Sequence, residues 1–251
     1  MISLRCSHII VTGGGSGIGK AIAARLLRGG ARVVIAGRHM DRLREAEREL
    51  ASDGLYCMEW DVSRAGEAEE HFERAKQLMG GFDGLVNNAA LGTSQATGRG
   101  YEPWDITPEE WDRLMDVNLK AAFFNMRTAV DIMRREGVRG NILNIASNAA
   151  CMDIVGSYGA AKLSLLKMTR AFGKRFGADG IIINGIAPGA TFTPMIARYA
   201  KAIDQPYPRH AIGRFIRPDE IAELAFYLMS NFGEIICGHT VVADGGDTAA
   251  V

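Results

Sequence analysis

Apolar and polar residues alternate in two different patterns along this chain. Short apolar runs rich in Val and Ile are separated by longer stretches in which apolar positions recur every three to four residues. The short runs are typical of buried β-strands, and the longer periodic stretches are typical of amphipathic helices. The runs that we predict to be strands are 8–12, 32–36, 55–60, 84–86, 141–146, 181–186 and 240–242. The predicted helices are 17–29, 40–52, 64–79, 108–135, 157–177 and 218–230.

The alternation of predicted strands and helices indicates repeated βαβ units and therefore a parallel sheet. The runs 141–146 and 181–186 are apolar on both faces, as expected when helices cover a sheet in front and behind. The sequence thus predicts a doubly wound α/β three-layer sandwich with a seven-stranded parallel sheet. No linker interrupts the pattern, so we expect residues 1–251 to form a single domain. The long segments 91–108 and 191–217 are expected to be functional, the second as a lid over the binding site.

The composition excludes several classes of partner. The chain has 251 residues, of which 29 are basic and 29 acidic, and neither sign forms a long block. We therefore expect neither nucleic acid nor a membrane surface as a partner. No window reaches the ~18 apolar residues that a membrane span needs. The four cysteines lie far apart without a C-x-x-C pair, which favours reduced thiols in a cytoplasmic protein and gives no indication of a metal site.

A glycine-rich turn follows the first predicted strand directly. Residues 12–19 read Thr-Gly-Gly-Gly-Ser-Gly-Ile-Gly and lead into an amphipathic helix. Glycines let a backbone approach a pyrophosphate, and the N–H groups and dipole at a helix start favour its negative charge. A tight turn alone would also use glycines, but the position between a strand and a helix predicts a Rossmann-type dinucleotide site. The residues expected to contact the dinucleotide are Gly13, Gly15, Ser16, Gly17, Ile18 and Gly19.

The end of the second predicted strand indicates which dinucleotide is bound. NAD-selective sites usually place a carboxylate here to hold the ribose hydroxyls, whereas this chain has Ala36-Gly37-Arg38-His39. The Arg38 guanidinium can fork onto a 2′-phosphate, so NADP(H) is favoured and NAD(H) is the alternative. Alternatively, Arg38 is a solvated loop arginine that binds no ligand.

Seven motifs, taken together, resemble the short-chain dehydrogenase/reductase superfamily, and within it the 3-oxoacyl-carrier-protein reductase-like branch. They are Thr12-Gly13-x-x-x-Gly17-x-Gly19, Asp61-Val62, Asn87-Asn88-Ala89, Asn118, Ser147, Tyr158-x-x-x-Lys162 and Pro188-Gly189-x-x-x-Thr193. The resemblance covers essentially the whole chain. It implies an NAD(P)(H)-dependent oxidoreductase that transfers a hydride between the nicotinamide and a carbonyl or secondary alcohol carbon of a small substrate. It also implies a homotetramer, paired through helices 108–135 and 157–177 and the C-terminal edge at 241–246.

Tyr158 and Lys162 are four residues apart in the predicted helix 157–177, so they share one face of it. An ammonium group near a phenol lowers the pKa of the phenol, which ordinarily lies near about 10. We therefore expect Tyr158 to exchange a proton with a substrate oxygen at neutral pH, as the general acid/base. The resemblance implies that Lys162 also holds the nicotinamide ribose. Without this context, such a pair is usually an exposed ring and a solvated charge.

Ser147 and Asn118 complete the expected catalytic set. Ser147 follows the strand 141–146 at the carboxyl edge of the sheet, where its hydroxyl can stabilise charge on a substrate oxygen. A helix N-cap or turn serine is the alternative. Asn118 lies inside the predicted helix 108–135, although asparagine is a poor helix former. The resemblance implies that Asn118 holds a water that relays protons to Lys162, and simple polar packing is the alternative.

The resemblance implies further contacts with the dinucleotide at the ends of three strands. Asp61 would hold the adenine amine with help from the Val62 backbone, although a cap for a helix near residue 65 explains this aspartate about equally well. Small residues after the fourth strand would let the backbone pass close to the adenosine ribose. The segment after the sixth strand would receive the nicotinamide carboxamide, unless its proline and threonine only shape a loop. The residues concerned are Asp61, Val62, Asn88, Ala89, Pro188, Gly189, Thr191 and Thr193.

The sequence leaves the substrate open. Specificity is expected to reside in the lid 191–217, the segment 91–108 and the loop 148–157. Charged lid residues such as Arg209 and His210 fit a carboxylate, a phosphate or a thioester carrier, or are simply solvated. A 3-oxoacyl thioester, a sugar-like polyol and a hydroxysteroid are all compatible with these features. Two other classes of function are alternatives: an isomerase or dehydratase that keeps the cofactor bound, and a non-catalytic dinucleotide sensor.

Overall fold

The computed structural model describes residues 2–98, 105–152, 156–196 and 202–248. The strands are β1 (His8–Thr12), β2 (Arg32–Gly37), β3 (Leu55–Glu59), β4 (Gly84–Asn87), β5 (Asn141–Ile145), β6 (Ile182–Pro188) and β7 (Thr240–Ala243). The α-helices are α1 (Gly17–Arg28), α2 (Met40–Leu50), α3 (Ala68–Met79), α4 (Thr93–Thr97), α5 (Pro108–Met115), α6 (Ala121–Glu136), α7 (Ser157–Phe176) and α8 (Pro218–Leu228). Short helical turns are η1 (Ala65–Glu67), η3 (Asp116–Lys120), η4 (Asn148–Cys151), η5 (Gly177–Asp179) and η6 (Gly233–Ile235). None of the described helices combines the length and apolar character needed to cross a bilayer.

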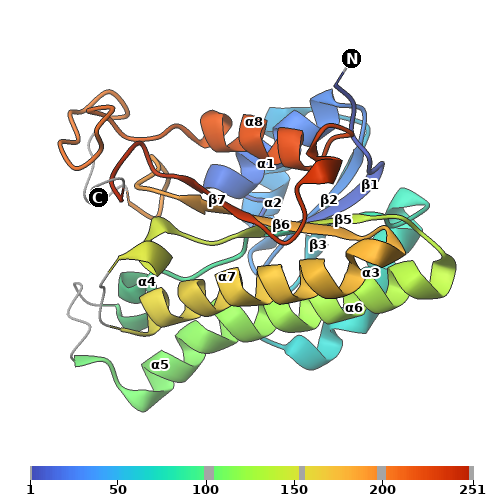
Figure 1. Ribbon diagram of the computed structural model, residues 1–251, viewed down its shortest axis with the longest axis horizontal. Coiled ribbons are helices and arrows are strands. Elements are labelled where there is room, and N and C mark those ends of the chain that lie inside the picture. The colour runs from blue at the N-terminus through green and yellow to red at the C-terminus, as the bar shows by residue number, and fades with distance from the viewer. Residues whose placement is uncertain (1, 99–104, 153–155, 197–201, 249–251) are drawn as a thin grey trace.

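The strands form one parallel sheet in the order β3-β2-β1-β4-β5-β6-β7. Helices α1, α2 and α8 cover one face of the sheet, and α3, α6 and α7 cover the other (Figure 1). This is the doubly wound, seven-stranded three-layer sandwich expected from the sequence. The chain runs outward from β1 to β3 and then returns to β4 beside β1. In such sheets, ligands bind at the carboxyl ends of the strands where the winding direction reverses.

Alternate side chains along each strand enter two separate apolar layers, because successive residues of a strand face opposite sides of the sheet. In β1, Ile9 and Val11 belong to the layer that contains Ile22 of α1. Ile10 belongs to the opposite layer, which contains Phe72 of α3. All of these side chains are fully buried. The sheet is therefore fixed on both faces, which holds the strand ends rigidly at its carboxyl edge.

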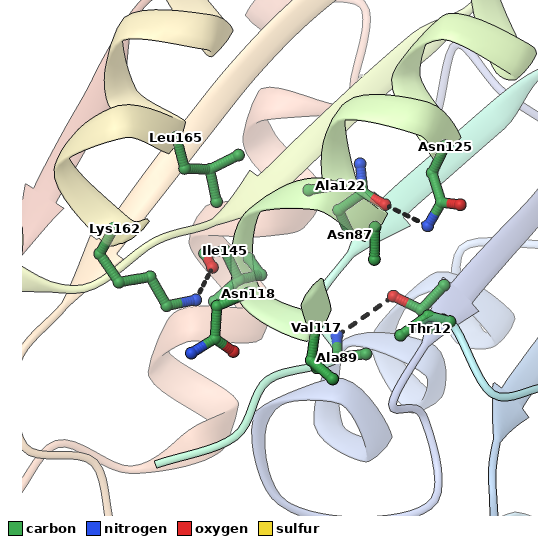
Figure 2. A pocket seen from close by; sticks show the side chains of 12 residues that line it. Thr12, Asn87, Ala89, Val117, Asn118, Ala122, Asn125, Ile145, Lys162 and Leu165 are labelled. Carbon is green, nitrogen blue, oxygen red and sulfur yellow. Dashed lines mark hydrogen bonds between the residues drawn. The ribbon is translucent and has the colours of Figure 1, made fainter. Parts of the chain in front are cut away.

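A chain of buried polar side chains crosses the layer between the sheet and helices α6 and α7. Asn87 of β4 donates to Asn144 of β5 at 3.0 Å, and Asn144 donates in turn to the Thr169 hydroxyl of α7 at 2.9 Å. Asn125 of α6 donates to Asn87 at 3.1 Å (Figure 2). A buried polar group that loses its partner costs about 1–3 kcal/mol. This polar chain therefore fixes two strands against two helices.

The structure corrects two predicted elements. The region 108–135 is not one regular helix, because the π-helical turn η3 separates α5 from α6, and Asn118 lies in that turn. Single π-turns inside α-helices are frequently found at functional sites. The segment 91–108 is not only a loop, since it contains the short helix α4; residues 99–104 of this segment lie outside the described residues. Within the predicted lid 191–217, residues 197–201 also lie outside them.

Candidate active site

Three adjoining hollows open at the carboxyl edge of the sheet. The glycine-loop cleft lies between the turn after β1, the residues after β4 and the first turn of α7. The lid pocket lies between the end of β5, the start of α7 and the lid. An acidic cleft adjoins the first of these at Arg38 and contains Asp61. Tyr158 lines both the glycine-loop cleft and the lid pocket, so it stands where the two meet.

Most of the predicted cofactor-binding residues line the glycine-loop cleft. They are Gly13, Ser16, Gly17, Ile18, Gly19, Arg38, Asn88, Ala89, Tyr158, Lys162 and Thr193. The lid pocket contains Ser147, Pro188, Gly189 and Thr191. Val62 and Asn118 line a small internal cavity beside Lys162. Gly15 lines none of these hollows and lies against α2, where a Cβ would be 3.3 Å from the Leu43 side chain.

The glycine turn has the shape that a pyrophosphate requires. Gly13 and Gly17 have φ angles of 67° and 52°, in the left-handed region that favours glycine. A Cβ at Gly19 would lie 2.4 Å from the Gly13 carbonyl oxygen. Helix α1 has no acidic residue in its first turn, and the side chain of its N-cap Ser16 makes no capping hydrogen bond. The N–H groups at the start of α1 are therefore available to an anion, and the residues present fit a dinucleotide.

Thr12 joins the glycine turn to the end of β4. Its Oγ1 accepts hydrogen bonds from the backbone N–H groups of Asn88 and Ala89, each at 3.1 Å, the second of which is drawn in Figure 2. The Asn88 amide donates back to the carbonyl oxygens of Thr12 and Gly13, at 2.9 and 3.1 Å. Asn88 thus braces the glycine turn, and its expected contact with the ribose stays a prediction. Thr12 opens the glycine motif in the sequence, but this bracing role was not predicted for it.

Three basic side chains stand at the edge of the glycine-loop cleft: Arg38, His39 and Arg42. All three are exposed, and none of them forms an ion pair with another described residue. Of the three, only Arg38 was predicted from the sequence. Because α2 begins at Met40, its first turn brings Arg42 to the same edge, which could not be seen without the position of the helix. The cleft therefore presents two arginine cations and a histidine where the second strand ends.

Ser147, Tyr158 and Lys162 come together at the end of β5. The Ser147 hydroxyl is hydrogen-bonded to the Tyr158 phenol, and it also accepts from the Ala149 N–H at 3.2 Å as the N-cap of η4. Lys162 is buried, and its Nζ lies 5.8 Å from the centre of the Tyr158 ring. Nζ donates to the Ile145 carbonyl oxygen at 2.9 Å (Figure 2). The first turn of α7 therefore places the phenol and the ammonium beside the serine, as the spacing predicts.

The expected lowering of the Tyr158 pKa is wrong for this structure. Burial raises the pKa of the phenol above its ordinary value, and the hydrogen bond from Ser147 offsets only part of that effect. Burial also lowers the pKa of Lys162 to about 8. Spacing along a helix predicts that two groups are neighbours, but it does not show how far each is removed from water, which dominates here. Tyr158 is therefore a protonated phenol at neutral pH.

Asn118 and Lys162 face the same small cavity (Figure 2). The Asn118 Oδ1 accepts from the Leu91 N–H, and its Nδ2 donates to the Leu91 carbonyl oxygen, both at 2.8 Å. These two bonds hold the start of the segment that follows β4, a contact that the sequence did not predict. The polar packing given as the alternative for Asn118 is therefore present, and the water relay to Lys162 stays a prediction.

Two further predicted residues have structural partners. Asp61 accepts hydrogen bonds from the Ser63 N–H at 3.1 Å and the Ser63 hydroxyl at 2.8 Å, so it closes a turn. It is not the helix N-cap given as its alternative role, because Arg64 occupies that position before η1. The Thr191 hydroxyl donates to the Gly189 carbonyl oxygen at 2.9 Å. The contacts of Asp61 with adenine and of Thr191 with the cofactor stay predictions.

The pKa of Lys162 predicts a change of stability with pH. Its ordinary value of 10.5 falls to about 8 on folding, so the unfolded chain binds one more proton than the folded protein between these values. Raising the pH through this window should therefore increase the free energy of unfolding relative to a Lys162→Met variant, by at most about 3 kcal/mol. Urea unfolding of both proteins at pH 7.5 and pH 10 measures the difference. A difference that is the same at both pH values would contradict the prediction.

The fold and the site define a class of enzyme that moves a hydride between a nicotinamide cofactor and a carbonyl or alcohol carbon. A family model described as enoyl-(acyl carrier protein) reductase matches residues 13–248. The chain belongs to the short-chain dehydrogenase/reductase superfamily and is a nicotinamide-dependent oxidoreductase that acts on CH–OH groups of a small substrate. The class expected from the sequence is thereby confirmed.

Named relatives support this assignment. The chain is 34% identical over 258 residues to 2,5-dichloro-2,5-cyclohexadiene-1,4-diol dehydrogenase of Sphingobium indicum, covering 99% of this chain and 100% of that protein. It is 32% identical to levodione reductase of Leifsonia aquatica, covering 96% and 94%. The crystal structure of a short chain dehydrogenase from Bacillus anthracis matches with a TM-score of 0.83, at 30% identity over 96% of both chains. A short-chain type dehydrogenase/reductase from Mycobacterium marinum gives 0.88, at 26% identity over 98% of this chain and 97% of that one. None of these four supports the isomerase or sensor alternatives.

Proposed function

We propose that this protein is an NADP(H)-dependent dehydrogenase/reductase of small cyclic alcohols or ketones, with Tyr158 as its general acid/base. The observation that carries the proposal is the position of Tyr158 where the glycine-loop cleft meets the lid pocket. A nicotinamide ring in the cleft and a substrate in the pocket would both lie beside the phenol. Proximity of this kind turns a reaction between separate molecules into a reaction within one complex.

When bound, the nicotinamide supplies or accepts the hydride. In the reducing direction, the Tyr158 hydroxyl donates its proton to the substrate oxygen, and its raised pKa keeps it protonated for that step. The Ser147 hydroxyl turns from the phenol to the same substrate oxygen and stabilises the negative charge that develops there. Lys162 uses N–H groups other than the one bonded to Ile145 to hold the nicotinamide ribose. Asn118 and a water in the cavity that it shares with Lys162 return a proton to the site.

The cluster of Arg38, His39 and Arg42 supports the preference for NADP(H), because an arginine without an ion-pair partner among the described residues is free to bind a 2′-phosphate. Carboxylates such as Glu109 and Asp112 line the adjoining acidic cleft, but none lies within ion-pair distance of Arg38. The remaining cofactor contacts are proposed at the positions where the resemblance puts them. These are Asp61 and Val62 for adenine, Asn88 and Ala89 for its ribose, and Pro188, Gly189, Thr191 and Thr193 for the nicotinamide.

The shape of the lid pocket supports a compact substrate. Its walls include the apolar side chains of Met152, Met195 and Ile196. One relative is named as a dehydrogenase of a cyclohexadiene-1,4-diol, so ring alcohols of six carbons are the first substrates to test.

The experiment that tests the proposal follows the absorbance of reduced nicotinamide with cyclic alcohols and ketones and with both cofactors. NADP(H) should give about 10- to 100-fold higher kcat/KM than NAD(H), because a charged hydrogen bond to the 2′-phosphate contributes about 1.5–3 kcal/mol. Arg38→Ala should remove most of this preference and leave the rate with NAD(H) unchanged. Arg48→Ala, an exposed arginine of the same helix region, is the matched control. An NAD(H) preference that Arg38→Ala does not alter would contradict the cofactor assignment.

Exposed apolar side chains support the expected homotetramer. Trp111 of α5 and Leu163 of α7 are exposed on helices that contact each other, and Phe232, Ile235 and Val242 are exposed in the C-terminal part of the chain, with Ile235 89% exposed. Symmetric oligomers commonly bury such faces against copies of themselves. Light scattering should give about 109 kDa, four times the chain mass of 27.2 kDa, and a monomer would reject the assembly. The four cysteines are free thiols, which supports the expected cytoplasmic location.

A further inference from the structure

The lid pocket contains a polar cluster built from three segments that are far apart in the sequence. Asn148 of η4, Arg209 of the lid and Asp247 of the C-terminal turn all line the pocket. The Asn148 Nδ2 donates to one Asp247 oxygen at 3.0 Å, and the Arg209 Nε donates to the other at 3.4 Å. The Asp247 side chain is only 8% exposed. A nearly buried carboxylate therefore stands in the wall of a pocket whose other walls are largely apolar.

Asp247 and its partner Asn148 are held in fixed positions. Asp244 accepts hydrogen bonds from the Gly246 and Thr248 N–H groups at 3.0 and 2.8 Å, which fixes the turn that presents Asp247. Asn148 is buried and directly follows Ser147. The position of Asn148 and Asp247 relative to the proposed reacting centre is thus set by the backbone that joins Ser147 to Asn148. A substrate bound at Ser147 and Tyr158 must place the rest of its body in the same pocket.

The cluster keeps hydrogen-bonding capacity that its own members do not use. A carboxylate has about four acceptor sites and a guanidinium has five N–H donors. Apart from its bond to Asp247, Arg209 has only a distant contact with the Met152 sulfur, at 3.8 Å, among the described residues. Asp247 can therefore accept from a ligand, and Arg209 can donate to one. Their charges cancel, so the cluster suits an uncharged oxygen better than a carboxylate or a phosphate.

We infer that Asn148, Arg209 and Asp247 bind a second, uncharged oxygen of the substrate, while the reacting oxygen lies at Ser147 and Tyr158. This inference rests on the proposed function and deepens it by naming the substrate class. The substrate is a compact ring that carries two oxygen functions, and its distant hydroxyl donates to Asp247 and accepts from Arg209. Arg209, which from the sequence alone fits an anionic substrate, is instead neutralised by Asp247.

The test compares kcat/KM for three ring alcohols with NADP⁺: cyclohexanol, cyclohexane-1,4-diol and 4-hydroxycyclohexanecarboxylate. For the wild-type protein, kcat/KM for the diol should exceed that for cyclohexanol by about 10-fold or more, after the diol value is halved because the diol has two equivalent hydroxyls. The carboxylate should be the poorest substrate. In Asp247→Asn, the preference for the diol should fall about 10-fold, and the carboxylate should gain about 10-fold because Arg209 loses its counter-charge. Cyclohexanol, which does not reach the cluster, should change by less than about three-fold.

Arg209→Gln provides a second test in case Asp247→Asn folds poorly. Arg209→Gln alters a side chain that is 59% exposed and leaves the cluster with a net negative charge. This variant should disfavour the carboxylate by about a further 10-fold and reduce the preference for the diol. Asp219→Asn is the matched control, since it makes the same chemical change on an exposed residue of α8. It should leave all three ratios unchanged.

The outcomes separate the inference from the proposed function. If the wild-type protein oxidises cyclohexanol and the diol equally, or if neither variant changes the ratios, the inference is wrong while the dehydrogenase remains. If none of the three alcohols, and none of the matching ketones with NADPH, reacts while the protein still binds NADPH, then the proposed function for cyclic substrates fails, and the inference fails with it.

Discussion

Tyr158→Phe should lower kcat by about 10²- to 10⁴-fold, the range that general acid/base catalysis contributes. The phenylalanine ring keeps the shape of the tyrosine and loses only the hydroxyl that is bonded to Ser147. The affinity for NADPH should therefore change by less than about three-fold. Single-turnover reduction of a cyclic ketone measures the chemical step, and fluorescence titration measures the binding of NADPH.

Tyr227→Phe provides the matched control for this prediction. It removes a hydroxyl from an exposed tyrosine of α8, on the sheet face opposite α7. Its kcat should equal that of the wild-type protein. If Tyr158→Phe retains more than about a tenth of the wild-type kcat, the proton does not pass through this phenol and another donor must be sought.

Gly19→Ala should weaken the binding of NADPH by about 100-fold or more. The added Cβ would lie 2.4 Å from the Gly13 carbonyl oxygen and equally close to the Asn88 amide nitrogen, so the glycine turn must move. A turn that moves no longer aims its N–H groups at the pyrophosphate. Each charge-assisted hydrogen bond contributes about 1.5–3 kcal/mol, so the loss of two accounts for at least that factor. Fluorescence titration with NADPH measures the dissociation constant.

Gly66→Ala is the matched control, because it adds the same Cβ at a position where the binding of NADPH should not change. A Cβ at Gly66 meets no other atom within 4 Å, and the residue lies in η1, away from the glycine turn. Its affinity for NADPH should match that of the wild-type protein. Binding by Gly19→Ala within about three-fold of the wild-type value would show that the pyrophosphate does not rest on this turn.

The elements of the fold could be read from the sequence because each one has its own pattern. The run at β5 carries apolar residues on both faces, and its predicted and observed bounds differ by a single residue. The π-turn η3 could not be predicted, because the extra residue in its hydrogen-bond ring is accommodated by packing against other segments. The low helix propensity of Asn118 was the only local sign of it. The five-residue helix α4 was missed because a segment of that length shows no periodicity.

The candidate site was predictable where it depends on chain order, and less so where it depends on environment. The glycine turn, Arg38 and the pair of Tyr158 and Lys162 follow from strand ends and helix spacing. The direction of the Tyr158 pKa does not, since it is decided by the segments that exclude water from the phenol. The polar cluster of the lid pocket also could not be predicted from the sequence, because Asn148 and Asp247 are 99 positions apart and meet only in the folded chain.

The polar chain from Asn125 through Asn87 and Asn144 to Thr169 has a consequence for how this sequence can be altered. Its apolar neighbours can be exchanged one at a time for others of similar volume at modest cost. Replacing any one of the four polar residues, by contrast, leaves its partners buried with unpaired hydrogen-bonding groups. In protein engineering, these four residues should therefore be kept together or replaced together.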